Sequence, residues 1–197
     1  MKINFFISAI IKQAWQLFKK KWTTIYGLFF LTLVVPIIYI LLSNKLESIF
    51  LHFVFFIVYY VLQLTISMGV FKAFLALIRG QQVSFELIFS TFQDFGKYFL
   101  GILMYLGVVI AGTLLLIIPG IIWAIKYVFV PFLIIDKGVN PKEAFKLSAQ
   151  MTKDIKWDIV GFYYTIIIYM YLGVLALVVG LFVTMPVAMI AYIIFYD

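Results

Sequence analysis

The sequence predicts an all-α integral membrane protein, and three observations carry the prediction. Hydrophobic residues make up 66% of the 197 residues and charged residues only 12%, whereas soluble domains are about half apolar and a quarter charged. Six apolar segments approach the length of about 20 residues that crosses about 30 Å of hydrocarbon. No stretch between them is long enough to bury a core of its own. We therefore expect one multi-pass membrane domain over residues 1–197.

The expected spans are helices, because a helix satisfies its own backbone hydrogen bonds in lipid. They cover residues 24–42, 49–71, 98–118, 121–135, 159–178 and 181–196. The fourth and sixth are short and follow their predecessors without a polar loop. The expected helix-breaking residues are Pro119, Gly120, Gly180 and Pro186. The third and fourth spans would form either a tight hairpin or a re-entrant unit, and so would the fifth and sixth spans.

The lysines and arginines predict the orientation, because cytoplasmic flanks are enriched in them. Apart from Lys45 and Lys126, every one of them falls on the same side of the expected spans. We therefore expect both termini in the cytoplasm. The first 22 residues carry lysines after their apolar residues and lack a small-residue cleavage pattern, so we do not expect a removable signal peptide.

The pattern of residues 3–22 predicts an amphipathic helix. On a helical wheel, one arc holds Ile7, Ile11, Ala14, Phe18 and Trp22. The other arc holds Ser8, Lys12, Gln16, Lys19 and Lys20, and Lys21 lies near the helix end. Such a helix would lie at the membrane boundary with its lysines on headgroup phosphates. The alternative is a helix packed on the cytoplasmic face of the protein itself.

A second amphipathic helix is predicted between the fourth and fifth spans. Asn140 can cap it, Pro141 suits its first turn, and Glu143 can reach back to the cap. One narrow face holds Ala144, Leu147, Ser148, Met151 and Ile155. The opposite side holds Lys142, Lys146, Ala149 and Lys153. The narrow face would dock on the helical bundle or on lipid.

Several chemistries are excluded by residues that the sequence lacks. There is no cysteine and only one histidine, His52, so thiolate and multi-histidine metal sites are ruled out. Neither a phosphate-binding glycine loop nor a Gly-x-Ser-x-Gly elbow is present. The acidic residues fall among lysines at the ends of spans, as solvated flank charges do. We expect no catalytic residue, no metal and no cofactor.

Lys126 is the one charge inside an expected span. Counted from Pro119-Gly120, it lies about 9 Å along the helix at 1.5 Å per residue. A lysine there can snorkel to the outer headgroups, with Trp123 and Tyr127 as interfacial neighbours. Alternatively, it is a buried cation held by carbonyls freed at a proline or by a lipid phosphate.

The C-terminal half resembles a bacterial membrane family. The relevant stretches are IIPGIIWAIKYVFVPFLIIDKGVNPKEAFKLSAQMTK, KWDIVGF and GLFVTMP. They resemble the YciC-like proteins and the membrane domain fused to some glycerophosphoryl diester phosphodiesterases. The matching positions are Pro119, Gly120, Lys126, Tyr127, Asp136, Glu143, Ala144, Phe145, Lys146, Ser148, Gly180, Leu181, Thr184 and Pro186. The chain departs from the family at Asp154, where a glycine is expected, and it has no phosphodiesterase domain. The resemblance implies a multi-pass protein of the bacterial inner membrane, in a group mostly without assigned function.

These observations favour a non-enzymatic membrane protein whose lysines engage anionic lipid or a membrane protein partner. A formal charge of +7 does not indicate nucleic acid here, because the lysines border apolar spans. The expected headgroup contacts are Lys12, Lys19, Lys20, Lys21, Lys142, Lys146 and Lys153. A homo-oligomer is a further possible assembly. The alternative function is a small transporter with a pathway between the two broken hairpin units.

Overall fold

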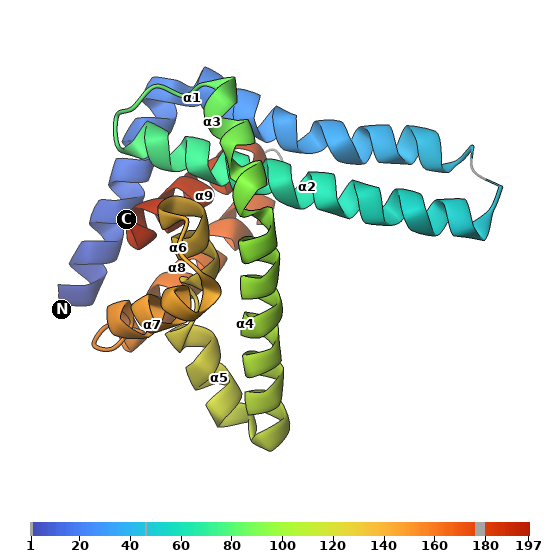
Figure 1. The fold of residues 1–197 in the computed structure, drawn as a ribbon. Coiled ribbons are helices and arrows are strands. Elements are labelled where there is room, and N and C mark those ends of the chain that lie inside the picture. The colour runs from blue at the N-terminus through green and yellow to red at the C-terminus, as the bar shows by residue number, and fades with distance from the viewer. Residues whose placement is uncertain (1, 46, 176–179) are drawn as a thin grey trace. The chain divides into compact units, whose positions relative to one another are not determined.

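The computed structural model describes residues 2–45, 47–175 and 180–197, with side chains from Ile7 onward. These residues form helices and no strand (Figure 1). In chain order the helices are α1 (Lys2–Ser43), α2 (Ile49–Ile78), α3 (Phe85–Phe89), the 3₁₀ helix η1 (Ser90–Asp94), α4 (Phe95–Leu115), α5 (Ile117–Lys126), α6 (Val130–Lys137), α7 (Pro141–Met151), α8 (Lys156–Leu175) and α9 (Leu181–Tyr196).

The helices confirm the all-α membrane fold. Five helical segments are long and apolar enough to cross a membrane, and α9 is a shorter apolar helix. The five segments are Ile7–Ser43, Ile49–Ile78, Phe85–Leu115, Ile117–Lys137 and Lys156–Leu175. The chain therefore has the architecture of a multi-pass membrane protein. It forms two compact units, one of Lys20–Gln93 and the other of Met1–Lys19 with Asp94–Asp197.

In the unit Lys20–Gln93, the second part of α1 runs beside α2 as an antiparallel pair (Figure 1). Aromatic rings join the two helices: Tyr39 lies 4.4 Å from Tyr59 and 5.4 Å from Phe55, between ring centroids. The expected span over residues 49–71 is longer in the structure, because α2 continues to Ile78. Short helix α3 packs on the C-terminal part of α2, where Gly69 leaves room for the backbone of Ile88.

In the other unit, α4 is paired with α5 and α6 in succession. Near the turn, Gly112 and Gly120 let α4 and α5 approach so closely that a Cβ on Gly112 would lie 3.0 Å from the Gly120 Cα. At the other end, the Lys97 ammonium donates to the Gly138 carbonyl at 3.0 Å and to the Asp94 carboxylate at 2.9 Å. The chain between α4 and α6 therefore follows α4 from end to end.

The break between the third and fourth expected spans is at Leu116, not at Pro119-Gly120. Leu116 has an extended backbone, with φ −164° and ψ 145°. Pro119 and Gly120 lie in the first turn of α5, where a proline is tolerated because its missing N–H has no helical partner anyway. The expectation that these two residues end a helix is therefore wrong, and they help a helix to begin.

The expected span over residues 121–135 is also interrupted, because α5 ends at Lys126 and α6 begins at Val130. Pro131 stands in the first turn of α6, and a proline disfavours helical backbone in the residue before it. The segment is thus two short helices joined by a turn.

Helices α8 and α9 form the last pair, and Gly173 of α8 packs directly against the side chain of Thr184 in α9. Residues 176–178 of the expected span 159–178 lie outside the described residues. Gly180 precedes α9 and has right-handed helical backbone angles, with φ −59° and ψ −28°, so these angles do not show the expected helix break. Pro186 does not end a helix, since α9 continues through it to Tyr196.

Aromatic side chains from α6, α8 and α9 form the core of this unit. The rings of Phe162 and Phe195 are stacked, with centroids 4.3 Å apart, and Phe129 lies 6.1 Å from Phe195. The Tyr196 hydroxyl donates to the Asp136 carboxylate at 3.0 Å. This bond ties the end of α9 to the end of α6.

Candidate functional site: the basic face of helix α7

Helix α7 has two opposite sides. The inner side is fully buried at Ala144, Ser148 and Thr152, each with 0% exposure. The outer side exposes the three lysines expected from the sequence, Lys142, Lys146 and Lys153. We call these three lysines the basic face. Of the two docking modes expected for α7, the structure shows packing on the bundle at Ala144 and Ser148, whereas Met151 of the expected narrow face is 38% exposed.

Two hydroxyls on the inner side of α7 hold the break between α5 and α6. The Ser148 hydroxyl donates to the Lys126 carbonyl at 3.0 Å and accepts from the Phe129 N–H at 3.3 Å. The Thr152 hydroxyl lies 3.0 Å from the same carbonyl. Backbone groups freed at a helix break need such partners when they are buried. Side chains of α7 thus replace the missing helical bonds.

The start of α7 agrees only partly with the sequence. Pro141 occupies the first turn and Asn140 the capping position, but the Asn140 side chain makes no capping hydrogen bond. A left-handed Gly138, with φ 63°, ends α6 just before it, and glycine adopts that conformation without strain. The turn between α6 and α7 is therefore built by Gly138 and Pro141.

Lys126 is the last residue of α5, and its side chain is half-buried. Its ammonium lies 5.2 Å from the centroid of the Tyr127 ring, within the range of a cation–π contact. The Tyr127 ring in turn lies 4.8 Å from the ring of Phe145 on α7. Counted from the true turn at Leu116, the ten residues of α5 place Lys126 about 15 Å along the helix, farther than the expected 9 Å.

The N-terminal segment of α1 is amphipathic in the structure, although its stripe is shifted. Protein atoms bury Ile7, Ile10, Ala14 and Phe18, so Ile10 takes the place expected for Ile11. This is the second of the two expected arrangements, a helix packed on protein. Trp22, which was expected on the same arc, is 55% exposed.

The lysines of this segment face outward. Lys12, Lys19, Lys20 and Lys21 are all exposed, and the Lys19 ammonium lies 5.6 Å above the Trp15 ring. Helix α1 consists of two helices joined at a kink, because Lys21 has non-helical backbone angles (φ −128°, ψ 25°). The amphipathic helix expected over residues 3–22 therefore ends close to its predicted end. Lys12 and Lys19 belong to the unit that contains α7, and Lys20 and Lys21 begin the other unit.

A groove of about 430 Å³ adjoins the basic face. Leu100 and Met104 of α4 form its apolar wall, and Asn140, Lys142 and Glu143 form its polar end. An apolar wall that leads to a lysine suits a lipid, whose acyl chain and headgroup have the same two characters. The sequence did not single out Leu100 and Met104, since nothing local distinguishes them from other apolar residues of α4.

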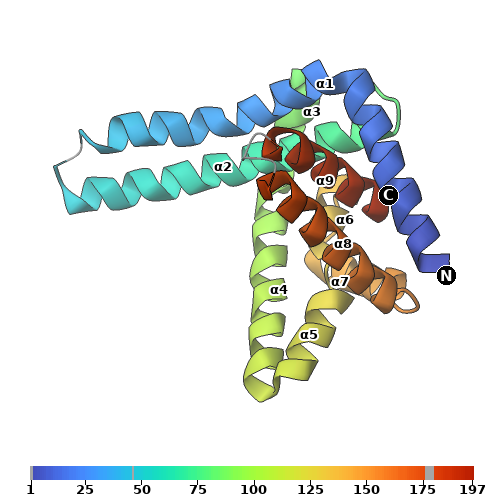
Figure 2. The ribbon, with the colours of Figure 1, turned by 180° about the vertical axis from the view of Figure 1, so that it is seen from behind.

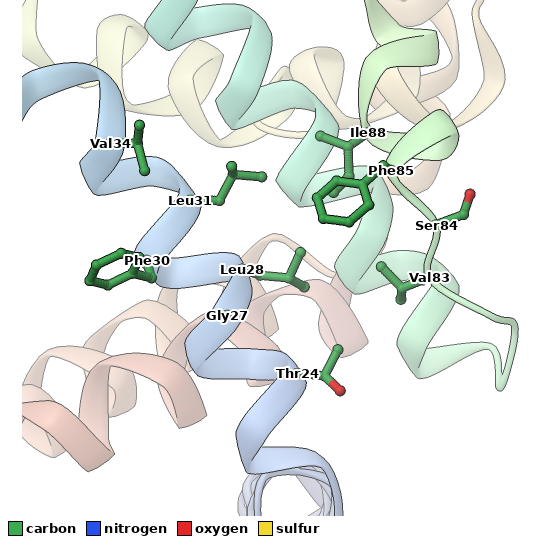
Figure 3. Close-up of a pocket in the computed structure, with 10 residues that line it drawn as sticks. All are labelled: Thr24, Gly27, Leu28, Phe30, Leu31, Val34, Val83, Ser84, Phe85 and Ile88. Carbon is green, nitrogen blue, oxygen red and sulfur yellow. The ribbon is translucent and has the colours of Figure 1, made fainter. Parts of the chain in front are cut away.

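A second groove, of about 360 Å³, lies in the unit Lys20–Gln93. Figure 3 shows its lining side chains, which come from α1 on one side and from α3 and the residues just before it on the other. Apart from the Thr24 and Ser84 hydroxyls the lining side chains are apolar. A groove of this kind on a membrane protein suits an acyl chain but does not select a headgroup.

In the described part of the chain, no three His, Cys, Asp or Glu side chains gather closely enough to hold a metal ion. No protein-family profile matches the chain, and neither the curated proteins nor the solved structures contain a match to it. The arrangement of these residues must therefore support any functional proposal on its own.

Proposed function

We propose that the protein is a non-enzymatic membrane protein that holds anionic lipid headgroups on its basic face and on the lysines of its N-terminal segment. One observation carries the proposal. The inner side of α7 is fixed by buried hydroxyls of Ser148 and Thr152, so its outer lysines stand on a rigid support. Lys142 and Lys146 lie one turn apart on the outer side of α7, and Lys153 follows just after the helix end, so three cations are available to headgroup phosphates.

Electrostatic attraction favours this contact. A lysine near an anionic membrane surface is attracted by about 1 kcal/mol, which corresponds to about fivefold in an equilibrium constant. Each lysine of the basic face is exposed, so its charge is available to lipid.

The proposed location is the bacterial cytoplasmic membrane, with the N- and C-termini in the cytoplasm. The support is the lysine asymmetry along the sequence and the resemblance of the C-terminal half to the YciC-like family. In this orientation the basic face meets the cytoplasmic leaflet. Anionic phospholipids are the proposed partners, and a membrane protein partner or a second copy of the chain would use the same lysines.

The structure offers one observation against the transport alternative. A broken helix can supply free carbonyls for a transported ion, and α5 and α6 are broken after Lys126. However, the Lys126 carbonyl already accepts hydrogen bonds from α7. Movement of a solute across proteoliposomes that is lost in Lys126→Gln would nevertheless favour transport over our proposal.

The test is the lipid that remains bound after purification in mild detergent. In the triple variant K142Q/K146Q/K153Q we expect the ratio of anionic to zwitterionic phospholipid to fall severalfold, because the cations that retain phosphate are gone. Lys45→Gln is the matched control, since Lys45 is exposed in the turn between α1 and α2. An unchanged ratio in the triple variant would contradict the proposal.

A further inference from the structure

The hairpin of α4 and α5 ends in a wholly apolar tip. Its five central side chains are between 69% and 82% exposed. They are Leu114, Leu115, Leu116, Ile117 and Ile118. Because α5 has ten residues, the tip extends about 15 Å beyond Lys126. A bilayer has a hydrocarbon core of about 30 Å, so this length corresponds to a single leaflet.

The base of the hairpin is fixed at the level of α7. The Thr152 hydroxyl reaches the Lys126 carbonyl at 3.0 Å, and the next two residues, Lys153 and Asp154, are exposed charges. Exposed charges are expelled from hydrocarbon. The end of α7 therefore lies outside the hydrocarbon, and its hydrogen bond to Lys126 keeps the end of α5 close to it.

Aromatic residues lie near the end of α5, at the base of the hairpin. The Tyr105 hydroxyl of α4 donates to the Ala124 carbonyl of α5 at 3.2 Å, and Tyr127 directly follows the last residue of α5. Trp157, just after the loop that follows α7, is 81% exposed. Tyrosine and tryptophan collect at membrane interfaces. Their position at the base of the hairpin, and not at its tip, places one interface there.

The tip is suited to hydrocarbon in its backbone as well as in its side chains. Leu116 interrupts the helix, yet its N–H donates to the Gly112 carbonyl at 3.1 Å and its carbonyl accepts from the Gly120 N–H at 3.4 Å. Pro119 has no N–H that would need a partner. An irregular turn in lipid must satisfy its backbone groups internally, and the groups of Leu116 do so.

We propose that the α4–α5 hairpin enters the membrane from the side of α7, ends near the bilayer midplane, and contacts the acyl chains of one leaflet only. The hairpin is then a wedge and not a pair of spans, which decides between the hairpin and the re-entrant unit that the sequence leaves open. Lys126 then belongs to the same interface as the basic face. Its ammonium extends that row of cations toward the lipid.

The chain contains no cysteine, so single cysteines report depth without background. In nanodiscs of zwitterionic lipid, a bimane dye on Leu116→Cys is tested with lipids brominated at different positions along the acyl chain. We expect the strongest quenching from bromines near the chain ends and no quenching by aqueous iodide. Zwitterionic lipid makes the result independent of the proposed anionic-lipid binding, so either proposal can fail without the other.

Two control positions show how strongly iodide quenches the dye in water. Asp154→Cys, in the loop after α7, should be quenched by iodide, and so should Asn44→Cys, in the turn between α1 and α2. Iodide quenching at Leu116→Cys, with weak quenching by terminal bromines, would show a tip in water and overturn the wedge. If Leu116→Cys does not fold, Ile118→Cys serves in its place, because its side chain is as exposed and its expected depth is the same.

Discussion

The hydroxyl of Ser148 joins three helices of the unit that contains α7. It donates to the last carbonyl of α5, accepts from the N–H of Phe129 just before α6, and is itself part of α7. The residue has no exposed surface, so water cannot replace it. A single oxygen atom thus satisfies both sides of a helix break.

Ser148→Ala should lower the free energy of unfolding by about 1 to 3 kcal/mol, because it leaves the buried Phe129 N–H without its acceptor. Unfolding followed by circular dichroism in mixed micelles measures the change. Ser67→Ala is the control, since its hydroxyl is exposed and bonds only to a carbonyl of its own helix. If Ser148→Ala lowers the free energy of unfolding no more than Ser67→Ala does, the helix break between α5 and α6 does not depend on Ser148.

Thr152→Val, alone and combined with Ser148→Ala, tests whether the Ser148 and Thr152 hydroxyls act together on the Lys126 carbonyl. Each single variant leaves one hydroxyl beside the Lys126 carbonyl, and the single proton of Thr152 is shared with the Ser148 carbonyl at 2.9 Å. The double variant leaves neither hydroxyl. We expect the double variant to lose more stability than the two single losses combined, by about 0.5 to 3 kcal/mol as for residues that share a partner. Additive losses in the same titration would contradict a shared role.

The sequence predicted Ser148 on the docking face of α7 but missed Thr152. A serine among apolar residues on a narrow face indicates a buried polar contact, and Thr152 lies one helical turn later on that same face. The carbonyl that both contact could not be predicted, because the break after Lys126 is far from them in sequence. Pro131 was the one local signal of that break.

Among the elements, α4 and α5 make a close helix contact at Gly112 and Gly120. A Cβ on Gly120 would meet the Thr113 side chain and would lie 2.8 Å from the Thr113 Cα and backbone N. A clash with backbone cannot be relieved by a side-chain rotation. Small residues are what lets apolar helices pack in lipid, where no hydrophobic force drives them together.

Gly120→Ala should therefore destabilise the hairpin by about 1 to 3 kcal/mol, as overpacking typically does. Gly107→Ala is the matched control on α4, because nothing lies within 4 Å of the Cβ that it would add. The control should be neutral or slightly stabilising, since alanine favours helix over glycine by about 1 kcal/mol. Equal stabilities of the two variants in mixed-micelle unfolding would argue against the close contact.

The position of this turn shows the limit of prediction at the scale of elements. Pro119-Gly120 indicated a turn between two apolar helices, and a turn is present. Its break falls at Leu116, an apolar residue in an apolar run with no turn signal of its own. The close approach of Gly112 and Gly120 places it there, and such tertiary contacts are not readable from a local pattern.

For the whole molecule, the apolar segments were sufficient to predict a multi-pass helical protein, because hydrocarbon allows few other solutions. The N-terminal segment was harder. Its 3.6-residue periodicity predicted an amphipathic helix and left open whether lipid or protein covers the apolar stripe, which protein covers at Ile10 and Ala14. Periodicity identifies an apolar side without identifying what packs against it.

The predicted orientation can be tested by labelling in intact cells and in inverted vesicles. A membrane-impermeant maleimide should react with Asp154→Cys only in inverted vesicles, because α7 is proposed to face the cytoplasm. It should react with Asn44→Cys only in intact cells whose outer membrane has been removed. The opposite pattern would place the basic face outside and would contradict the proposed cytoplasmic contact.

The most direct test of the lipid contact is the composition of lipid around α7 in a bilayer. A donor dye on Gln150→Cys, an exposed position of α7, reports energy transfer to a trace of acceptor-labelled anionic or zwitterionic lipid in nanodiscs.

We predict that transfer to the anionic acceptor exceeds transfer to the zwitterionic one. The excess should shrink with salt as the Debye length falls from about 10 Å at 0.1 M to about 3 Å at 1 M. It should also disappear when Lys142, Lys146 and Lys153 are replaced by glutamine. Equal transfer to the two acceptors at low salt would contradict the account.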